Sequence, residues 1–260
     1  MLTTSGSVIA GSCEPPQPTA VITDGAAVGT VGATSGPLPR MRPGYRFLRY
    51  LSQMFFVFFC RGRVFGVRNV PRRGGVLLVS NHQSYLDPVL ATLALPREGN
   101  YMARDTLFGQ RHFRRLIEYL NAFPVKRGAA DVGAVKEMLR RLKGGQVVLA
   151  FPEATRTADG SIGPMRAGVI LVARKARVPV VPTLILGAFE AWPRTAPLPR
   201  PHPVLVAYGE PLYPHAHPEW DEEQCVRVVR DRILALRARF ATHPNAGREP
   251  RPRSAAWRGL

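Results

Sequence analysis

The sequence predicts an α/β fold: a single domain in which helices flank a mostly parallel central sheet, preceded by one amphipathic helix. Short apolar runs of strand length alternate, over roughly residues 65–210, with stretches whose apolar residues recur at helical spacing. The chain has 260 residues, of which 45% are apolar, and this is enough for a sizeable core. Strands that alternate with helices are typical of a parallel sheet covered by helices.

Residues 1–43 are predicted to form a disordered tail. They are rich in Gly, Ala, Thr, Pro and Ser and show no helix or strand periodicity, so they cannot bury enough apolar area to offset the entropy of ordering. No basic stretch precedes the first apolar residues, which argues against a secretory signal. We therefore expect the protein to stay on the cytoplasmic side.

Residues 44–64 are predicted to form the amphipathic helix. Their uninterrupted apolar part, Met54 to Cys60, is far shorter than the roughly 20 residues that a membrane-spanning helix needs. Aromatic residues flanked by arginines suit a membrane-interface helix at the headgroup boundary beside anionic lipid. An ordinary buried helix is the alternative, and it stays open.

The domain itself is predicted to extend over residues 65–243, with a strand that begins just before it. The expected strands are RVFGV, GVLLVSN, NYMAR, AFPVKR, QVVLAFPE, VVPTLILG and PVLVAYG. Three helices are indicated by apolar stripes, which consist of Phe113, Leu116, Ile117 and Leu120; of Val132, Val135, Leu139 and Leu142; and of Val226, Val229, Ile233, Leu236 and Phe240. Asp221 and Gln224 indicate a capping box at the start of the last helix. Residues 244–260 are predicted to be a flexible basic tail.

Charge and cysteine content narrow the classes of partner. The formal net charge is +18, and residues 40–86 contain nine arginines and no acidic residue, which favours an anionic partner. A basic nucleic-acid-binding protein is an alternative of a different class, but no zinc-finger or RNP-type motif is present and the arginines are spread over helices and tails. The three scattered cysteines indicate a reducing compartment, without a disulfide framework or a zinc site.

His82 and Asp87 stand five residues apart, after the apolar run GVLLV. On one continuous helix they would point about 140° apart, so they can meet only if the backbone turns between them. We expect the strand to end near Asn81 and a helix capped by Ser84 to begin at Tyr85. Asp87 would then hold one imidazole nitrogen and leave the other as a free base for an attacking hydroxyl. An ordinary capping box from Ser84 to Asp87 stays open as the alternative.

Ser84 itself could be proposed as a nucleophile for His82. The chain has no G-x-S-x-G elbow, which argues against a serine hydrolase.

A second polar loop, FPEATRTADG, follows the predicted strand QVVLA. In open α/β sheets ligands bind past the carboxyl ends of the strands, and His82 would lie at the same edge. Arg156 could bind a phosphate through two donors, and Glu153 could accept a hydrogen bond from a hydroxyl or orient a basic group. A solvated turn is the alternative. Lys126 and Arg127 are basic residues at the end of a third predicted strand, AFPV, and could also bind an anion. The alternative is that they are an ordinary surface pair.

Several of these segments, in this order, resemble the motifs of one family. NHQSYLD resembles the N-H-x-x-x-x-D motif, and FPEATRT the F-P-E-G-T-R-S motif, of glycerolipid acyltransferases of the 1-acyl-glycerol-3-phosphate acyltransferase type. NAFPVKRG looks like the second motif of that family and VPVVPTLI like the fourth. The resemblance covers roughly residues 65–210.

The resemblance implies that His82 removes the proton of an acceptor hydroxyl and that Asp87 orients it. It implies that the acceptor, a lysophospholipid, is bound by Arg127, Glu153, Thr155 and Arg156. Attack on an acyl thioester, from acyl-CoA or acyl-carrier protein, would be direct and would need no cofactor, no metal and no acyl-enzyme. The implied product is phosphatidic acid, formed by an enzyme that binds membrane lipids peripherally on the cytoplasmic side of the cell membrane.

Two positions depart from the family pattern. Ala154 stands where the third motif usually has glycine, which restricts the backbone if that position needs a positive φ. Asn121 stands where glycine is common in the second motif. Both departures leave the acceptor open, and another lysophospholipid or an acylated amino lipid is the alternative for the same chemistry. A non-catalytic lipid-binding relative would be favoured if His82 or Asp87 were missing, and both are present.

Overall fold

The protein is built on one seven-stranded sheet, seen in a computed structural model that describes residues 41–126 and 131–246. The strands are β1 (Arg63–Phe65), β2 (Val76–Ser80), β3 (Gly99–Arg104), β4 (Ala122–Val125), β5 (Val147–Ala150), β6 (Val180–Leu186) and β7 (Leu205–Tyr208). Their order across the sheet is β1-β7-β6-β2-β5-β3-β4. All seven predicted strands are therefore confirmed, within a few residues at their ends.

The sheet is mostly parallel, as predicted. Strands β2 to β6 run in one direction, whereas β7 is antiparallel to β6 and β1 is parallel to β7. Every residue of β2, β5 and β6 is buried, which explains why these strands read as continuous apolar runs rather than alternating ones.

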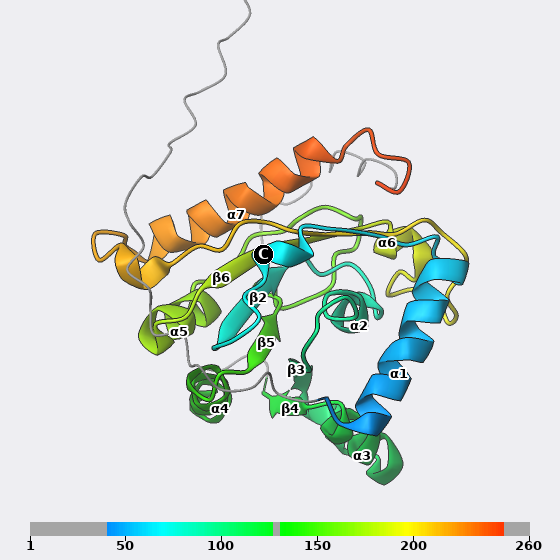
Figure 1. The fold of residues 1–260 in the computed structure, drawn as a ribbon, viewed down its shortest axis with the longest axis horizontal. Coiled ribbons are helices and arrows are strands. Elements are labelled where there is room, and N and C mark those ends of the chain that lie inside the picture. The colour runs from blue at the N-terminus through cyan, green and yellow to red at the C-terminus, as the bar shows by residue number, and fades with distance from the viewer. Residues whose placement is uncertain (1–40, 127–130, 247–260) are drawn as a thin grey trace, which may run out of the picture. The chain divides into compact units, whose positions relative to one another are not determined.

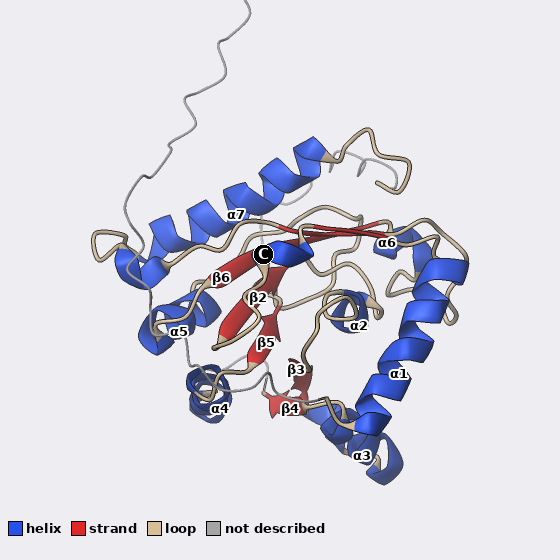
Figure 2. Ribbon diagram, in the orientation of Figure 1, coloured by secondary structure: helices blue, strands red, loops and turns tan. Residues whose placement is uncertain are grey.

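Helices cover both faces of the sheet and divide the core into two layers (Figures 1 and 2). One layer is covered by α4 (Val132–Lys143), α5 (Gly168–Ala176) and α7 (Glu222–Arg239). The other is covered by α2 (Asp87–Leu90), α6 (Ala188–Ala191) and the π-helical turn Phe55–Phe59 that continues α1 (Pro43–Met54). Short 3₁₀ turns cover Val67–Asn69, Asp105–Phe108 and Pro214–Ala216.

The start and the buried face of the last helix, α7, agree with the sequence prediction. The Asp221 carboxylate accepts from Gln224 N at 2.7 Å, and the Gln224 side chain accepts from Asp221 N at 3.1 Å, so the predicted capping box is confirmed. Val229 and Ile233 are buried against β6 and its neighbours, which confirms the apolar face of α7.

The amphipathic helix before the domain is present as α1, and its two faces differ. Tyr45 and, in the following turn, Phe56 are buried, whereas Phe47 and Phe58 are 61% and 76% exposed. The buried-helix alternative thus describes only one face, and the other is left uncovered. Among the described residues every helix is too short or too polar to span a bilayer.

The helix that carries the first predicted stripe, α3 (Arg111–Tyr119), follows a different pattern from the others. It has no buried residue, and Phe113 and Leu116 of the stripe are 41% and 46% exposed. The predicted helix is therefore confirmed, but it is not packed into the core. Its position is the physical reason: α3 leads into β4, the edge strand of the sheet, where no second layer of the described elements covers it.

The two predicted tails lie almost wholly outside the described residues. Residues 41–43, which were assigned to the first tail, are ordered: Arg42 forms an ion pair with Glu98 at 2.8 Å, and α1 begins at Pro43. Proline at the first turn of a helix costs no hydrogen bond, which explains why the helix starts there.

Candidate active site

The loop after β2 brings His82 and Asp87 together. His82 Nδ1 lies 2.8 Å from Asp87 Oδ2, and the side chains are 13% and 0% exposed. Oδ2 also accepts the backbone N–H groups of Gln83 and Ser84, at 2.5 and 2.7 Å. Because this oxygen acts as an acceptor toward all its neighbours, it orients the imidazole with the proton on Nδ1. Nε2, the other ring nitrogen, forms no hydrogen bond within the described residues and is available as a base.

The predicted helix start at Tyr85 is wrong, and so is the capping box from Ser84 to Asp87. Helix α2 begins at Asp87, and no side chain caps its N-terminus. The Ser84 hydroxyl instead donates to Trp192 O at 2.8 Å and accepts from Leu86 N at 3.2 Å. The carboxylate of Asp87 holds a turn of the preceding loop rather than a helix end, because the loop turns back over it.

Glu153 connects this loop to the loop after β5. Its Oε1 accepts from His82 N at 3.0 Å and its Oε2 accepts from Gly163 N at 2.9 Å. A side chain at position 163 would crowd that carboxylate, since a Cβ there would lie 3.0 Å from Oε2. Thr157 N donates to His82 O at 2.9 Å and adds a second link between the loops. Because β2 and β5 are parallel neighbours, the two polar loops meet at one sheet edge, as predicted.

The buried position of Glu153 also changes its acidity. Burial raises the pKa of Glu153 to about 7, and the nearby carboxylate of Asp87 adds to the rise. The two backbone N–H donors and Arg230 act in the opposite direction and offset only part of the effect.

Arg156 lies over an aromatic ring at the same edge. Its guanidinium carbon is 3.5 Å from the centre of the Tyr85 ring, a close cation–π contact. One of its terminal nitrogens, Nη1, is buried and has no hydrogen-bond partner among the described residues. An unpaired, buried guanidinium nitrogen is a donor suited to an anionic ligand. Thr155, beside it in the loop, is exposed.

The two departures from the family motifs both occupy left-handed backbone. Ala154 has φ +61° and Asn121 has φ +65°, so each stands at a position where glycine is favoured. Asparagine tolerates this conformation better than alanine does. The strain that the sequence predicted at position 154 is therefore confirmed.

Two contributors to the site were missed by sequence reasoning. The ring of Phe151 stacks on His82 with centroids 4.0 Å apart and an angle of 16° between the planes. Trp192, from the segment after α6, packs against Tyr85 with centroids 5.2 Å apart. Phe151 is the first residue after β5, so its position at the strand end was a usable signal. Trp192 is more than a hundred residues from Tyr85, and nothing local in the sequence indicates the contact.

Of the predicted substrate-binding residues, Arg127 lies outside the described residues. Lys126, beside it, donates its backbone N–H to Asp131 at 2.8 Å. Within the described ranges no three His, Cys, Asp or Glu side chains are grouped as metal ligands.

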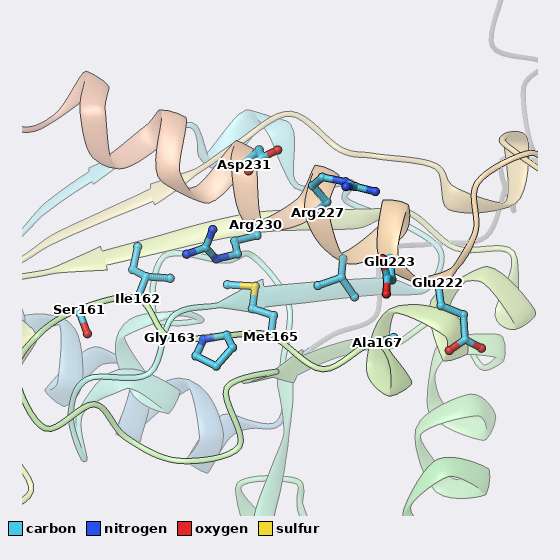
Figure 3. Close-up of a pocket in the computed structure, with 12 residues that line it drawn as sticks. Ser161, Ile162, Gly163, Met165, Ala167, Glu222, Glu223, Arg227, Arg230 and Asp231 are labelled. Carbon is cyan, nitrogen blue, oxygen red and sulfur yellow. The ribbon is translucent and has the colours of Figure 1, made fainter. Parts of the chain in front are cut away.

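A cavity of about 700 Å³ lies between the loop that follows FPEATRT and the first turns of α7, and Gly163, whose N–H binds the Glu153 carboxylate, is one of its lining residues. Its lining includes the apolar side chains of Met165 and Val226 and the charged side chains of Arg227 and Arg230. Figure 3 shows Met165 on the loop and both arginines on α7. A lining of apolar and charged side chains suits an amphiphilic ligand.

Comparison with known proteins agrees with this geometry. Residues 61–186 match the family model described as Acyltransferase, a range that includes the loops after β2 and β5. The chain is 29% identical over 126 residues to the 1-acyl-sn-glycerol-3-phosphate acyltransferase of Bacillus subtilis, covering 48% of this chain and 62% of the relative. It is 31% identical over 131 residues to the chloroplastic enzyme of that description from Brassica napus, covering 49% of this chain and 38% of the relative. The chain thus spans about half the length of the curated relatives that it matches.

A solved structure is similar over a longer range. It is the crystal structure of the 1-acyl-sn-glycerophosphate (LPA) acyltransferase from Thermotoga maritima, with a TM-score of 0.67 and 26% identity. The similarity covers 76% of this chain and 80% of that one, and it confirms the α/β fold.

Proposed function

Because residues 61–186 belong to the acyltransferase family, we propose that the chain transfers a fatty acyl group to the free hydroxyl of 1-acyl-glycerol-3-phosphate. The donor is an acyl thioester, acyl-CoA or acyl-carrier protein, and the product is phosphatidic acid. The observation that carries the proposal is the hydrogen bond of 2.8 Å between His82 Nδ1 and the buried Asp87 carboxylate, at the end of a central strand.

In this mechanism His82 Nε2 removes the proton from the acceptor hydroxyl as its oxygen attacks the thioester carbonyl. The Asp87 carboxylate stabilises the imidazolium that forms. A carbon–oxygen bond forms and the carbon–sulfur bond breaks. The imidazolium returns its proton to the departing sulfur. One imidazole both accepts the hydroxyl proton and delivers it to the sulfur. Because the acceptor oxygen itself attacks the thioester, the chemistry needs no nucleophilic side chain of the protein.

Arg156 is the proposed contact for the acceptor phosphate. Its buried Nη1 lacks a partner, and a phosphate oxygen would supply one. The Tyr85 ring holds the guanidinium in place by its cation–π contact. Arg127 and Thr155 remain predicted contacts for the same phosphate.

Glu153 is proposed as a positioning residue rather than a direct contact. Both of its oxygens accept backbone N–H groups, one of them from His82, so the side chain fixes the catalytic loop relative to the neighbouring strand. The sequence prediction grouped Glu153 with the residues that hold the acceptor and also allowed it an orienting role; the proposal here is the orienting role.

Binding to the cytoplasmic face of the membrane is part of the proposal, because a lipid acceptor has to be taken from a bilayer. The uncovered apolar face of α1, which includes Phe47 and Tyr50, supports peripheral attachment.

The function is tested by supplying purified protein, in vesicles, with labelled acyl-CoA or acyl-carrier protein and a panel of lysolipids. The panel includes 1-acyl-glycerol-3-phosphate, other lysophospholipids and an acylated amino lipid. We expect labelled phosphatidic acid, and we expect His82→Ala to abolish it. Full transfer by His82→Ala would contradict the mechanism, and transfer to another acceptor alone would contradict the proposed substrate.

A further inference from the structure

Helix α3 presents an apolar stripe that nothing in the described part of the chain covers. Phe113 and Leu116 are about half exposed, and Leu107, in the 3₁₀ turn that precedes the helix, is 44% exposed. Helix α4 exposes Val132 and Val135 of its predicted stripe but buries Ala134, Met138 and Leu142 against the sheet. Helix α3, beyond the edge strand β4, has no buried residue at all. The exposed stripe therefore needs either an apolar partner or a boundary between water and an apolar phase.

The rest of α3 is strongly basic. Arg111, Arg114 and Arg115 are all exposed, and the one acidic residue of the helix, Glu118, pairs with Arg114 at 2.8 Å. Within the described residues Arg111 and Arg115 form no ion pair. A short helix with a basic polar face and a large-residue apolar face is typical of elements that lie in the headgroup region of an anionic bilayer.

The two uncovered helices are fixed to each other. Arg42, just before α1, donates to Tyr119 O at 2.6 Å, at the end of α3, and its guanidinium lies 4.8 Å from the Tyr119 ring centre. Gly44 allows this approach, because a Cβ there would lie 2.2 Å from the Tyr119 hydroxyl. Figure 1 shows α1 and α3 meeting at this junction. Their exposed apolar faces therefore belong to two elements that contact each other directly.

We infer that α3, with Leu107, is a second membrane-contact element that binds the surface of an anionic bilayer beside α1. The inference rests on the proposed function, since it concerns how the enzyme meets its lipid. Phe113 and Leu116 enter the headgroup boundary, while Arg111 and Arg115 contact lipid phosphates. Two neighbouring contact elements fix the orientation of the protein on the membrane, which one helix alone would leave free to rotate.

The test uses the full-length protein and flotation with vesicles of phosphatidylcholine, with and without phosphatidylglycerol. The α3 variants remove the apolar pair or the charged pair: Phe113→Ser with Leu116→Ser, and Arg111→Gln with Arg115→Gln. Helix α4 offers matched controls that change equally exposed residues on a helix remote from α1: Val132→Ser with Val135→Ser, and Lys136→Gln with Lys143→Gln. Thermal unfolding of every variant checks that it folds.

We expect the apolar pair to weaken binding to anionic vesicles roughly tenfold or more. The arginine pair should weaken it by about thirty-fold at low salt and leave binding to neutral vesicles unchanged. The α4 controls should bind like the wild type. Turnover of a monomeric, short-chain lysophosphatidate should be unaffected in all four variants, because the reacting groups are untouched.

Failure of the inference and failure of the proposed function are distinguishable. Folded α3 variants that float like the wild type overturn the inference, whatever the enzyme assay shows. If the wild type floats with anionic vesicles, the α3 variants do not, and no lysolipid is acylated, the proposed function is contradicted and the inference is supported. Variants that bind vesicles normally but lose turnover only with acyl-carrier protein as donor would assign α3 to an acidic protein partner, and this would also overturn the inference.

Discussion

Replacing Asp87 by asparagine separates the charge of the proposed catalytic pair, His82 and Asp87, from its geometry. Oδ2 of Asp87 accepts from two backbone N–H groups and lies 2.8 Å from His82 Nδ1, so an amide oxygen in the same place would keep all three contacts. The amide nitrogen would then replace Oδ1, which is buried and has no partner among the described residues. A buried, unpaired amide group costs about 1–3 kcal/mol of stability. We therefore expect a folded variant with a lowered melting temperature.

The catalytic effect follows from the lost charge. At an effective dielectric constant of about 20, two unit charges about 4 Å apart attract by about 4 kcal/mol. Since each 1.36 kcal/mol is a factor of ten in rate, full loss of this attraction would slow the reaction by about a thousandfold. The amide dipole keeps part of it, so we expect kcat to fall by roughly 10² to 10³ with a smaller change in KM.

The assay is acyl transfer to 1-acyl-glycerol-3-phosphate over a range of acceptor concentrations, with thermal unfolding measured in parallel. Asp87→Ala is the comparison, because it also removes the acceptor for two backbone N–H groups and should destabilise the loop more strongly. A folded Asp87→Asn variant with wild-type kcat would refute the assignment of His82 and Asp87 as a charge-stabilised base.

Three further predictions address the surroundings of this pair. Ala154→Gly should remove the strain of an alanine in the left-handed backbone region. Glycine also increases the entropy of the unfolded chain, so the net gain in the free energy of unfolding should be about 0.5–1 kcal/mol. An unchanged melting temperature would contradict this prediction. Because burial raises the pKa of Glu153 to about 7, its contribution to the free energy of unfolding is fully present below about pH 4.5 and is lost as the pH rises through 7. The wild type should lose up to about 3 kcal/mol over that range relative to Glu153→Gln, and parallel stability curves would contradict it. Tyr85→Leu removes the ring that contacts Arg156 and should raise the KM for the phosphate-bearing acceptor roughly fivefold. Tyr85→Phe keeps a ring and should leave this KM unchanged. Equal effects of the two variants would argue against a cation–π role.

The fold was predictable where burial leaves a local trace. The central strands β2, β5 and β6 are buried on both faces, so they appear in the sequence as uninterrupted apolar runs of strand length. The capping box at Asp221 is likewise a contact between residues three apart, which any reader of the sequence can find. The stripe of α3 carried the same kind of signal, yet its residues are exposed, because a stripe records that a helix is amphipathic and not what covers it.

For the candidate site, the sequence placed His82, Asp87, Glu153 and Arg156 at strand ends, and the parallel arrangement brought their loops to one edge. It could not give the order of the strands or the reversal of β7, since these depend on which edges meet in three dimensions. It also could not assign the oxygens of Glu153, which bind backbone groups at positions 82 and 163.

The sequence by itself indicated the fold class, the candidate pair His82 and Asp87 and the resemblance to an acyltransferase family, because each depends on residue types at short, fixed spacings. Only the tertiary structure decided what those groups contact. It showed that Asp87 holds a loop rather than capping a helix, that Glu153 connects the loops after β2 and β5, and that Phe151 stacks on His82. These contacts involve backbone N–H groups and an aromatic ring, which occur throughout the chain. Packing of the whole chain, rather than any local sequence pattern, determines which of them meet.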